Sequence, residues 1–172
     1  MQKLLPFAIS SLLAAPAVEA LAADMTLKIE VPRLNVAEYH KPYVAIWIEK
    51  PDQTFAGNLA VWYDMKKRNN EGTKYLKDLR QWWRRSGREL TMPVDGISGA
   101  TRTTGEHSLS FAGDKGALAT LPAGDYQLLV EAAREDGGRE VVKIPFHWQA
   151  KGEQSLQAKG NTELGMISLN IK

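Results

Sequence analysis

Residues 126–148 read YQLLVEAAREDGGREVVKIPFHW and give the clearest indication of the fold. Two apolar runs, 126–133 and 140–148, flank the turn residues EDGGR at positions 135–139. A turn of this kind between two apolar runs is typical of a β-hairpin. In the second run alternate residues are large and apolar, as on the buried face of a strand: Val142, Ile144, Phe146 and Trp148. The sequence therefore predicts two antiparallel strands here.

Similar patterns extend over most of the chain. Further strands are predicted over residues 25–31, 43–48, 59–63, 107–111 and 164–171. The run 43–48 is almost continuously apolar, which suits a central strand covered on both sides. About seven strands with turns between them predict an all-β fold, an immunoglobulin-like β-sandwich, in a single domain over residues 23–172. The polar residues 151–162 are expected to form a loop.

One segment, residues 74–86, has the periodicity of a helix. Its large apolar residues recur at the spacing of one helical face: Tyr75, Leu76, Leu79, Trp82 and Trp83. Thr73 is suited to cap the start of this helix, and Gly87 is suited to end it in a left-handed conformation. The sequence therefore predicts one short helix inserted into the sandwich.

The first 22 residues have the features of an export signal. Lys3 precedes an uncharged, mostly apolar stretch over residues 4–18, and Ala20-Leu21-Ala22 matches a cleavage site. The apolar stretch is too short to span a membrane as a helix. We therefore expect cleavage near Ala22 and a periplasmic product that is not itself embedded in the membrane.

The composition excludes several classes of site. The 172 residues include no cysteine, which rules out disulfides, zinc–thiolate sites, iron–sulfur sites and a catalytic cysteine. The 22 basic and 20 acidic residues leave a formal charge of +2, so no nucleic-acid partner is indicated. His40, His107 and His147 lack a metal-ligand spacing. No nucleophile elbow, Walker loop or pair of carboxylates indicates intrinsic catalysis, so we do not expect an enzyme.

Small and hydroxyl-bearing residues gather after the predicted helix, where residues 95–101 read DGISGAT. Gly96, Gly99 and the nearby Gly105 predict a tight, exposed loop. Such a loop can present a hydroxyl to a large partner, or backbone N–H groups to a phosphate. By residue type alone, an ordinary connection between strands is the more common explanation of this pattern.

Residues 95–101 also resemble the flavinylation motif D-x-x-[ST]-G-A-T of bacterial FMN carriers. These carriers include subunits of the sodium-pumping NADH:quinone reductase and of the Rnf electron-transport complex. Every fixed position of the motif is matched. The resemblance implies that Thr101 accepts FMN in a phosphoester bond, formed from FAD by an exported FAD:protein FMN transferase that uses Mg²⁺. Thr103 and Thr104 lie outside the motif and are poorer candidates.

The same resemblance implies roles for the other motif residues. Asp95 would assist recognition by the transferase or the transient placement of Mg²⁺, although a side chain that stabilises a turn is the alternative. Ser98, Gly99 and Ala100 would shape the loop around the acceptor.

The whole chain beyond the export signal resembles a family of predicted periplasmic proteins of unknown function. The resemblance rests on the signal peptide, on the tryptophan-rich motif at residues 75–84, YLKDLRQWWR, and on the loop at residues 95–101 followed by a hairpin. Members occur near flavin transferases and near membrane proteins with PepSY-type domains. The resemblance therefore implies a membrane-bound redox partner, for which a PepSY-type protein is one candidate.

Several residues outside the motif are candidates to contact the flavin. Trp82 or Trp83 could stack on the isoalloxazine ring. Neighbouring helix residues point about 100° apart, so only one can do so, and core packing is the alternative for each. Arg88 and Arg102 could neutralise the phosphodiester or the reduced flavin, with solvated surface charge as the alternative. His107 follows the motif closely and is a further candidate.

Two functions from different classes follow from these observations. The first is a periplasmic electron carrier with FMN attached covalently to Thr101, which is a substrate of the transferase and not an enzyme. The second is an immunoglobulin-like binding or accessory module without a cofactor, in which the loop is a recognition surface and the tryptophan helix a docking face.

Overall fold

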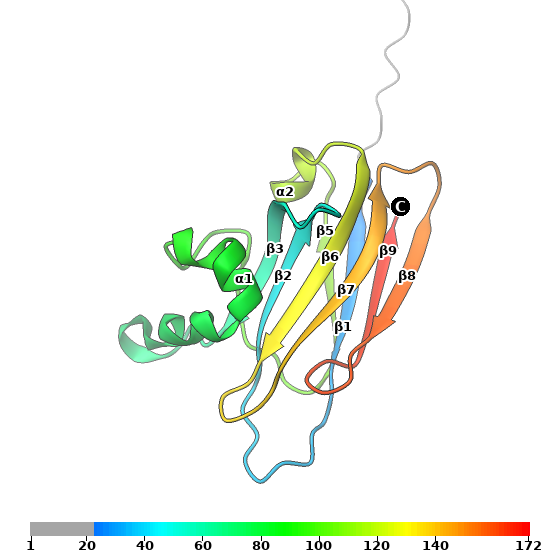
Figure 1. The fold of residues 1–172 in the computed structure, drawn as a ribbon. Helices are drawn as coiled ribbons and strands as arrows, with labels where there is room; N and C mark the ends of the chain where they lie inside the picture. The colour runs from blue at the N-terminus through cyan, green and yellow to red at the C-terminus, as the bar shows by residue number, and fades with distance from the viewer. Residues whose placement is uncertain (1–22) are drawn as a thin grey trace, which may run out of the picture.

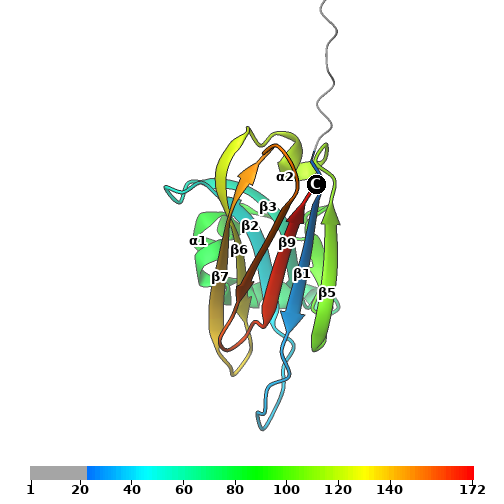
Figure 2. The same ribbon diagram turned by 90° about the vertical axis from the view of Figure 1, so that its right-hand side faces the viewer.

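The computed structural model describes residues 23–172, and the expected signal peptide, residues 1–22, lies outside the described residues. The described chain contains nine strands in two sheets that pack face to face (Figures 1 and 2). This arrangement confirms the predicted β-sandwich, with nine strands in place of about seven. Within residues 23–172, no helix is both long and apolar enough to cross a membrane.

The first sheet has four strands in the order β5-β1-β9-β8. Strand β1 (Met25–Val31) lies between β5 (Gly105–Phe111) and β9 (Met166–Ile171), and β8 (Gln154–Lys159) forms one edge. All neighbouring strands in this sheet are antiparallel. On β1 alternate side chains are buried: Met25, Leu27, Ile29 and Val31. The alternation in the sequence therefore defines the face that meets the core.

The second sheet has five strands in the order β4-β3-β2-β6-β7. Strand β2 (Tyr43–Glu49) lies at its centre, between β3 (Phe55–Tyr63) and β6 (Gly124–Ala133). Strands β6 and β7 (Arg139–Trp148) form the predicted hairpin. The short strand β4 (Ser98–Ala100) pairs with β3 in parallel, whereas the other pairs of this sheet are antiparallel.

Both faces of the second sheet are covered, which explains the continuously apolar sequence of β2. Val44, Ile46 and Ile48 point into the main core between the two sheets. Ala45 and Trp47 point the other way, into a second cluster beneath a helical segment. These five side chains have no exposed surface. The expectation of a central strand covered on both sides is therefore confirmed.

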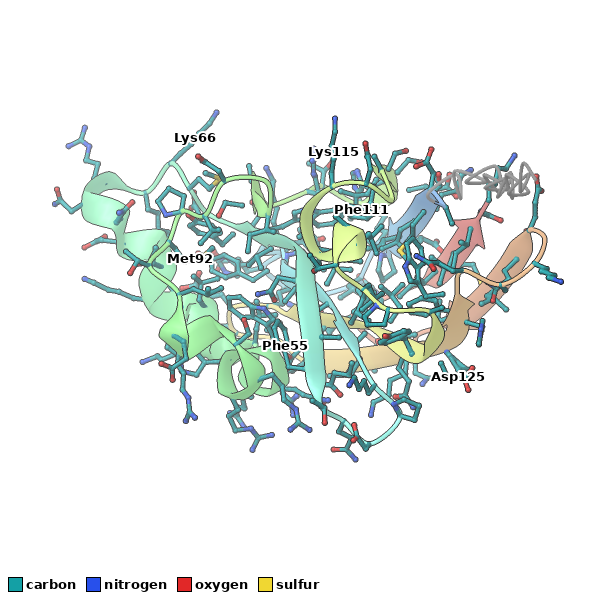
Figure 3. The ribbon with its side chains drawn as sticks, turned by 90° about the horizontal axis from the view of Figure 1, so that it is seen from above. Phe55, Lys66, Met92, Phe111, Lys115 and Asp125 are labelled. Atoms are coloured by element: carbon teal, nitrogen blue, oxygen red, sulfur yellow. The ribbon has the colours of Figure 1, made fainter. Side chains whose placement is uncertain are left out.

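The helical segment consists of the 3-10 helix η1 (Arg68–Asp78), α1 (Arg80–Arg85) and a second 3-10 turn, η2 (Gly87–Glu89). It lies beside β3 on the outer side of the second sheet, with Lys66 and Met92 in the loops that flank it (Figures 1 and 3). Its buried side chains, Leu76, Leu79 and Trp82, complete the second cluster. A fourth short helix, α2 (Gly116–Ala119), packs near β3.

The prediction of one regular helix over residues 74–86 is wrong in its details. The segment starts earlier, as a 3-10 helix, and contains Asn69 and Asn70 with φ of 54° and 56°, in the left-handed region. Thr73 lies inside η1 and does not cap a helix, because its hydroxyl donates to the carbonyl of Asn70 at 2.7 Å. Only residues 80–85 are α-helical.

Gly87 does not end the helix in a left-handed conformation, since its φ is not positive. A Cβ atom at this position would lie 2.5 Å from Cζ3 of Trp82. The chain therefore needs glycine here because the buried indole of Trp82 packs directly against the backbone.

Two strands, β4 and β8, lie where the sequence predicts loops. On β8 the inward positions are occupied by Leu156 and Ala158, which are only partly buried. Such a polar edge strand carries little hydrophobic alternation. The residues of β4 form a strand because their backbone pairs with β3.

Glu131, on β6, holds the start of α1 against the second sheet. Its side chain is fully buried beneath the helix. The carboxylate accepts hydrogen bonds from the backbone N–H groups of Gln81 at 3.1 Å and Trp82 at 2.8 Å, and from Arg139 at 3.0 Å. The first N–H groups of a helix have no partner inside it, and α1 has no capping side chain of its own. A side chain of the sheet therefore satisfies them.

We expect the variant Glu131→Gln to lower the free energy of unfolding by about 2–3 kcal/mol, because it replaces a buried, charge-assisted acceptor and turns an amide N–H₂ toward donors. Urea denaturation monitored by tryptophan fluorescence measures this change. The control is Glu153→Gln, at an exposed carboxylate 3.9 Å from Lys172, which should change stability by less than about 0.5 kcal/mol. Equal stability of the two variants would contradict the role given to Glu131.

Candidate functional site

The motif residues 95–101 begin in a tight turn. The N–H of Ile97 donates to the carbonyl of Val94 at 3.4 Å, and Gly96 has φ of 81°, a conformation that favours glycine. The hydroxyl of Ser98 accepts a hydrogen bond from the backbone N–H of Val94 at 2.8 Å. Gly96 and Ser98 thus stabilise the turn that leads the chain into β4.

Pairing with β3 then sets the position of Thr101. The N–H of Val61 donates to the carbonyl of Ile97 at 2.7 Å, and the N–H of Thr101 donates to the carbonyl of Tyr63 at 3.2 Å. At Gly99 a Cβ atom would lie 3.2 Å from Cδ1 of Trp62, so the small residue allows close packing on β3. The backbone of Thr101 is therefore held by hydrogen bonds to β3, although residues 95–101 were expected to form a tight, exposed loop.

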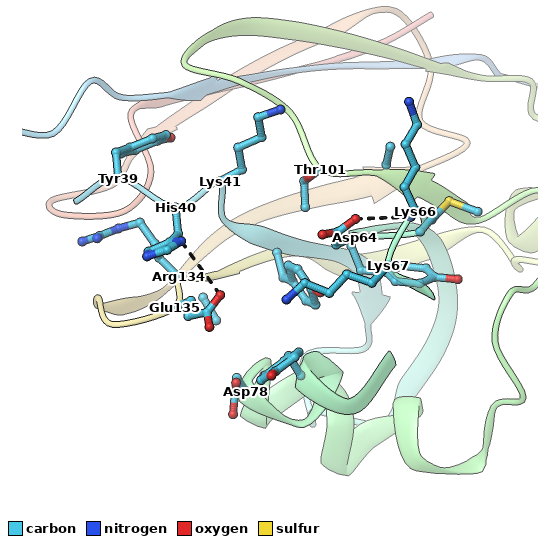
Figure 4. A pocket seen from close by; sticks show the side chains of 16 residues that line it. Tyr39, His40, Lys41, Asp64, Lys66, Lys67, Asp78, Thr101, Arg134 and Glu135 are labelled. Carbon is cyan, nitrogen blue, oxygen red and sulfur yellow. Dashed lines mark hydrogen bonds and ion pairs between the residues drawn. The ribbon is translucent and has the colours of Figure 1, made fainter. Parts of the chain in front are cut away.

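Thr101 lines a pocket of about 630 Å³ at one end of the second sheet (Figure 4). The other walls come from the chain before β2, the residues that follow β3, the helix η1 and the turn after β6. The lining residues are Tyr39, His40, Lys41, Tyr43, Tyr63, Asp64, Met65, Lys66, Lys67, Tyr75, Asp78, Ala100, Thr101, Ala133, Arg134 and Glu135. This volume lies in the range typical of pockets for cofactors and other small molecules.

Aromatic side chains form much of the pocket wall. The rings of Tyr43 and Tyr63 meet edge to face, with centroids 6.4 Å apart. Burial raises the pKa of Tyr43 to about 12, so its hydroxyl stays protonated and donates to the carbonyl of Gly72 at 3.0 Å. Tyr75 and Met65 are 39% and 41% exposed, unusually open for large apolar side chains. The pocket therefore offers apolar surface as well as polar groups.

Lysine ammonium groups and carboxylates share the pocket. Lys41 and Lys66 are exposed, and the ammonium of Lys67 lies 4.7 Å from the centroid of the Tyr75 ring. Asp64 accepts a hydrogen bond from the backbone N–H of Lys66 at 3.2 Å. Thr101 lies between Lys41 and Asp64 in Figure 4. A ligand attached at Thr101 would thus meet charges of both signs.

A second charged group, around Arg134, supports the wall formed by the turn after β6. Arg134 and Glu163 form a buried ion pair at 2.9 Å. The hydrogen bond to Glu163 raises the pKa of Arg134 further. Nearby, His40 lies 3.9 Å from Glu135 and 3.6 Å from Glu38. The Arg134–Glu163 ion pair therefore joins the turn after β6 to the loop that precedes β9.

Glu140 organises the loop that carries Glu163. Its carboxylate accepts hydrogen bonds from four successive backbone N–H groups, those of residues 161–164. Partial burial alone would raise the pKa of Glu140, but these four donors together lower it below its ordinary value. The ionised carboxylate therefore holds this loop in place and, through Glu163, the side chain of Arg134.

The structure brings only two of the predicted site residues to the pocket, Thr101 and Ala100. Ser98 and Gly99 lie on β4 and support its turn and its packing. Asp95 is exposed in the turn at the other end of β4 and does not line the pocket.

Thr103 and Thr104 are exposed and also lie outside the pocket lining. Of the three neighbouring threonines, Thr101 is therefore the one that lines this pocket.

The two tryptophans of the helical segment are packed side chains. Trp82 has no exposed surface, and its Nε1–H donates to Oδ1 of Asn58 at 2.8 Å. Trp83 is partly buried against the second cluster, with its ring 6.3 Å from that of Trp82. Neither lines the pocket. The core-packing alternative is therefore correct for Trp82, which has no free face for stacking on a flavin.

Arg88, Arg102 and His107 also lie away from the pocket lining. Arg88 is exposed and pairs with Glu89 at 3.1 Å, as expected of surface charge. The guanidinium of Arg102 lies 5.3 Å from the ring of Trp62, and His107 meets the same ring edge to face. The expected flavin contacts of these residues therefore find no support in their positions.

Sequence reasoning missed most of the pocket wall, above all Tyr43, Tyr63, Tyr75 and Lys67. They come from β2, β3, the connection after β3 and the helical segment, and only the fold brings them together. One signal was present: residues 66–70, KKRNN, span the connection after β3 and the start of η1, and asparagine tolerates the left-handed conformation that reverses the chain. Within residues 23–172, no cluster of three or more potential ligands could hold a metal ion.

Comparison with known proteins places this chain in a family. Residues 24–166 match the model of the family DUF2271, described as predicted periplasmic protein, and the chain belongs to this family. The description agrees with the periplasmic location expected from the sequence. Searches of curated proteins and of solved structures found no match.

We expect the variant Glu140→Gln to lower the free energy of unfolding at pH 7 by about 1–3 kcal/mol, because the amide loses charge-assisted hydrogen bonds from residues 161–164. Since the folded pKa of Glu140 is lowered, its carboxylate contributes stability above the unfolded pKa and loses it as the pH falls through the folded pKa. The difference from the wild type should therefore shrink below about pH 4.

Chemical denaturation of both proteins from about pH 3 to about pH 7, a range that spans the titration of carboxyl groups, measures this dependence. The control is Glu106→Gln, at an exposed carboxylate that pairs with Lys28 at 3.1 Å and binds no loop backbone. A difference for Glu140→Gln that stays constant over this range would refute the account.

Proposed function

We propose that this member of the DUF2271 family of periplasmic proteins carries FMN on Thr101 in a phosphoester bond and serves as an electron carrier. One observation carries the proposal: the threonine that completes the D-x-x-[ST]-G-A-T pattern lines a pocket of about 630 Å³. The motif alone does not require a pocket at this position. Its presence beside Thr101 supports attachment of a sizeable group there.

The residues around Thr101 fit the chemical parts of FMN. A phosphodiester at the hydroxyl carries one negative charge, and Lys41 and Lys66 line the same pocket. The isoalloxazine ring is flat and aromatic, and the pocket lining includes four tyrosines and Met65. A covalent bond would also retain the flavin outside the cytoplasm, where a free cofactor can diffuse away.

The transfer would be carried out by an FAD:protein FMN transferase with Mg²⁺. The Thr101 oxygen would form a bond to the phosphorus on the FMN side of FAD, and the bond from that phosphorus to AMP would break. The hydroxyl proton would be released, so the products are the flavinylated protein, AMP and a proton. Residues 102–106, which follow Thr101, are exposed, which supports access by the transferase.

Attached FMN would supply the redox chemistry, because a flavin accepts one or two electrons. The chain would hold and orient it, exchanging electrons with a membrane-bound redox partner, of which a PepSY-type protein is one candidate. In this proposal the chain has no catalytic residue of its own.

The proposal predicts that mature protein made together with the transferase gains the mass of one FMN less one water. Thr101→Ala should abolish this gain, whereas the double variant Thr103→Ala/Thr104→Ala should load as the wild type does. Intact-mass spectrometry of the three proteins measures the loading, and a known carrier loaded in parallel reports that the transferase is active.

Two outcomes would contradict it. An unmodified wild type beside a loaded carrier would favour the alternative, a binding or accessory module without a cofactor. Loss of loading in the double variant with retention in Thr101→Ala would move the acceptor to Thr103 or Thr104.

A further inference from the structure

We infer that the pocket beside Thr101 holds the isoalloxazine ring, and that the ammonium of Lys67 stabilises the negative charge that the ring gains on reduction. This inference rests on the proposed function, because it needs the flavin on Thr101. It goes beyond attachment by naming the surface that binds the ring and the residue that sets its redox preference.

The apolar part of this surface is formed by Tyr75 and Met65. Both are large side chains with about two fifths of their surface exposed, 39% and 41%, and both line the pocket. An exposed aromatic ring can bury part of its surface against a flat aromatic ligand and gain both area and stacking. Tyr75 therefore offers the ring an apolar seat in the pocket that Thr101 lines, and Met65 adds apolar surface elsewhere in the same pocket.

The segment that carries these residues is fixed to the sheet before any ligand binds. A Cβ atom at Gly72 would lie 2.0 Å from the carbonyl oxygen of Asp64, so the two backbone stretches are in direct contact. The hydroxyl of Tyr43 donates to the carbonyl of Gly72 and ties the same point to β2. Tyr75, three residues further on, is therefore held in position, which reduces the entropy lost on binding.

Lys67 places a positive charge beside Tyr75. Its ammonium lies 4.7 Å from the centroid of the Tyr75 ring, and Lys67 forms no ion pair among the described residues. Its side chain is also less exposed than that of Lys66. Because this ammonium lies over the Tyr75 ring, a flavin ring that docks at Tyr75 would displace it toward the flavin edge and lie beside a charge that no carboxylate of residues 23–172 pairs with.

Of the other charged side chains of the pocket, some are paired, whereas Lys41 and Lys66 are exposed and line the same pocket. Arg134 is paired with Glu163, and Glu135 lies beside His40. Asp64 and Asp78 line the pocket and oppose added negative charge. Since Coulomb energy falls with distance, the contribution of Lys67 follows from its position beside the Tyr75 ring.

The redox step gives this ammonium its role. A flavin ring that takes up two electrons and one proton carries one negative charge, with the electrons supplied by the reduced membrane-bound partner of the proposed function. An ammonium beside the ring attracts this charge and has no such interaction with the neutral oxidised ring. Lys67 therefore favours the reduced form and raises the reduction potential.

The test compares flavinylated wild type with Lys67→Gln and with Lys74→Gln. Lys74 is the control, because it lies on η1 next to Tyr75, pairs with Glu71 at 3.6 Å and does not line the pocket. We expect Lys67→Gln to reduce the preference for the reduced form about tenfold, which corresponds to a two-electron midpoint potential lower by about 30 mV. Lys74→Gln should leave it unchanged. Redox titration followed by flavin absorbance measures both.

A second variant, Tyr75→Leu, tests the seat by another measurement. Loss of the stacked ring should increase the fluorescence of the oxidised flavin several-fold, with Lys74→Gln again unchanged. Intact mass is measured on every sample. If the wild type made with the transferase lacks the FMN mass, the proposed function is refuted, and the inference falls with it.

Full loading with equal potentials for Lys67→Gln and Lys74→Gln would overturn the role of Lys67. Full loading with unchanged fluorescence in Tyr75→Leu would overturn the seat. In both cases covalent attachment to Thr101 would stand.

Discussion

Beneath helix α1 two buried carboxylates of the second sheet hold the helical segment in place. Glu131 accepts the first backbone N–H groups of α1, and Glu49 pairs with Arg85, its last residue, at 3.1 Å. A helix of six residues has too few internal hydrogen bonds to be stable alone, so these contacts and the packing of Trp82 maintain it. Since η1 continues into α1 and supplies Tyr75 to the pocket, the shape of the candidate site depends on the same two acids.

The candidate acceptor and the candidate ring seat are supported in different ways. Thr101 directly follows β4, whose backbone is hydrogen-bonded to β3. This pairing fixes the position of the Thr101 backbone. Tyr75 and Lys67 belong to a segment that folds back through two left-handed asparagines. Thr101, held through its backbone, thus faces a wall that contains both apolar and charged side chains. This is the arrangement expected of a site that positions a bound group.

Local sequence patterns predicted the sandwich well and the site only in part. The hairpin of β6 and β7 follows from the alternation of apolar residues, and the doubly covered β2 follows from a continuous apolar run. Both patterns could be read from the sequence because they reflect which side chains are buried. Strand β4 could not be predicted, since its three small residues are ordered by pairing with β3. The pocket wall was missed for a similar reason: Tyr43 and Tyr75 are far apart in sequence, and only tertiary packing brings them beside Thr101.

Attachment in the pocket wall would change how tightly the ring must bind. A group tethered at Thr101 is confined next to its seat at an effective concentration in about the millimolar range. A contact free energy of about 4 kcal/mol, equivalent to millimolar affinity, then keeps the ring docked roughly half of the time. Covalent attachment would thus allow the ring to bind its pocket weakly and reversibly. The ring could then leave the pocket to meet a partner and return without being lost.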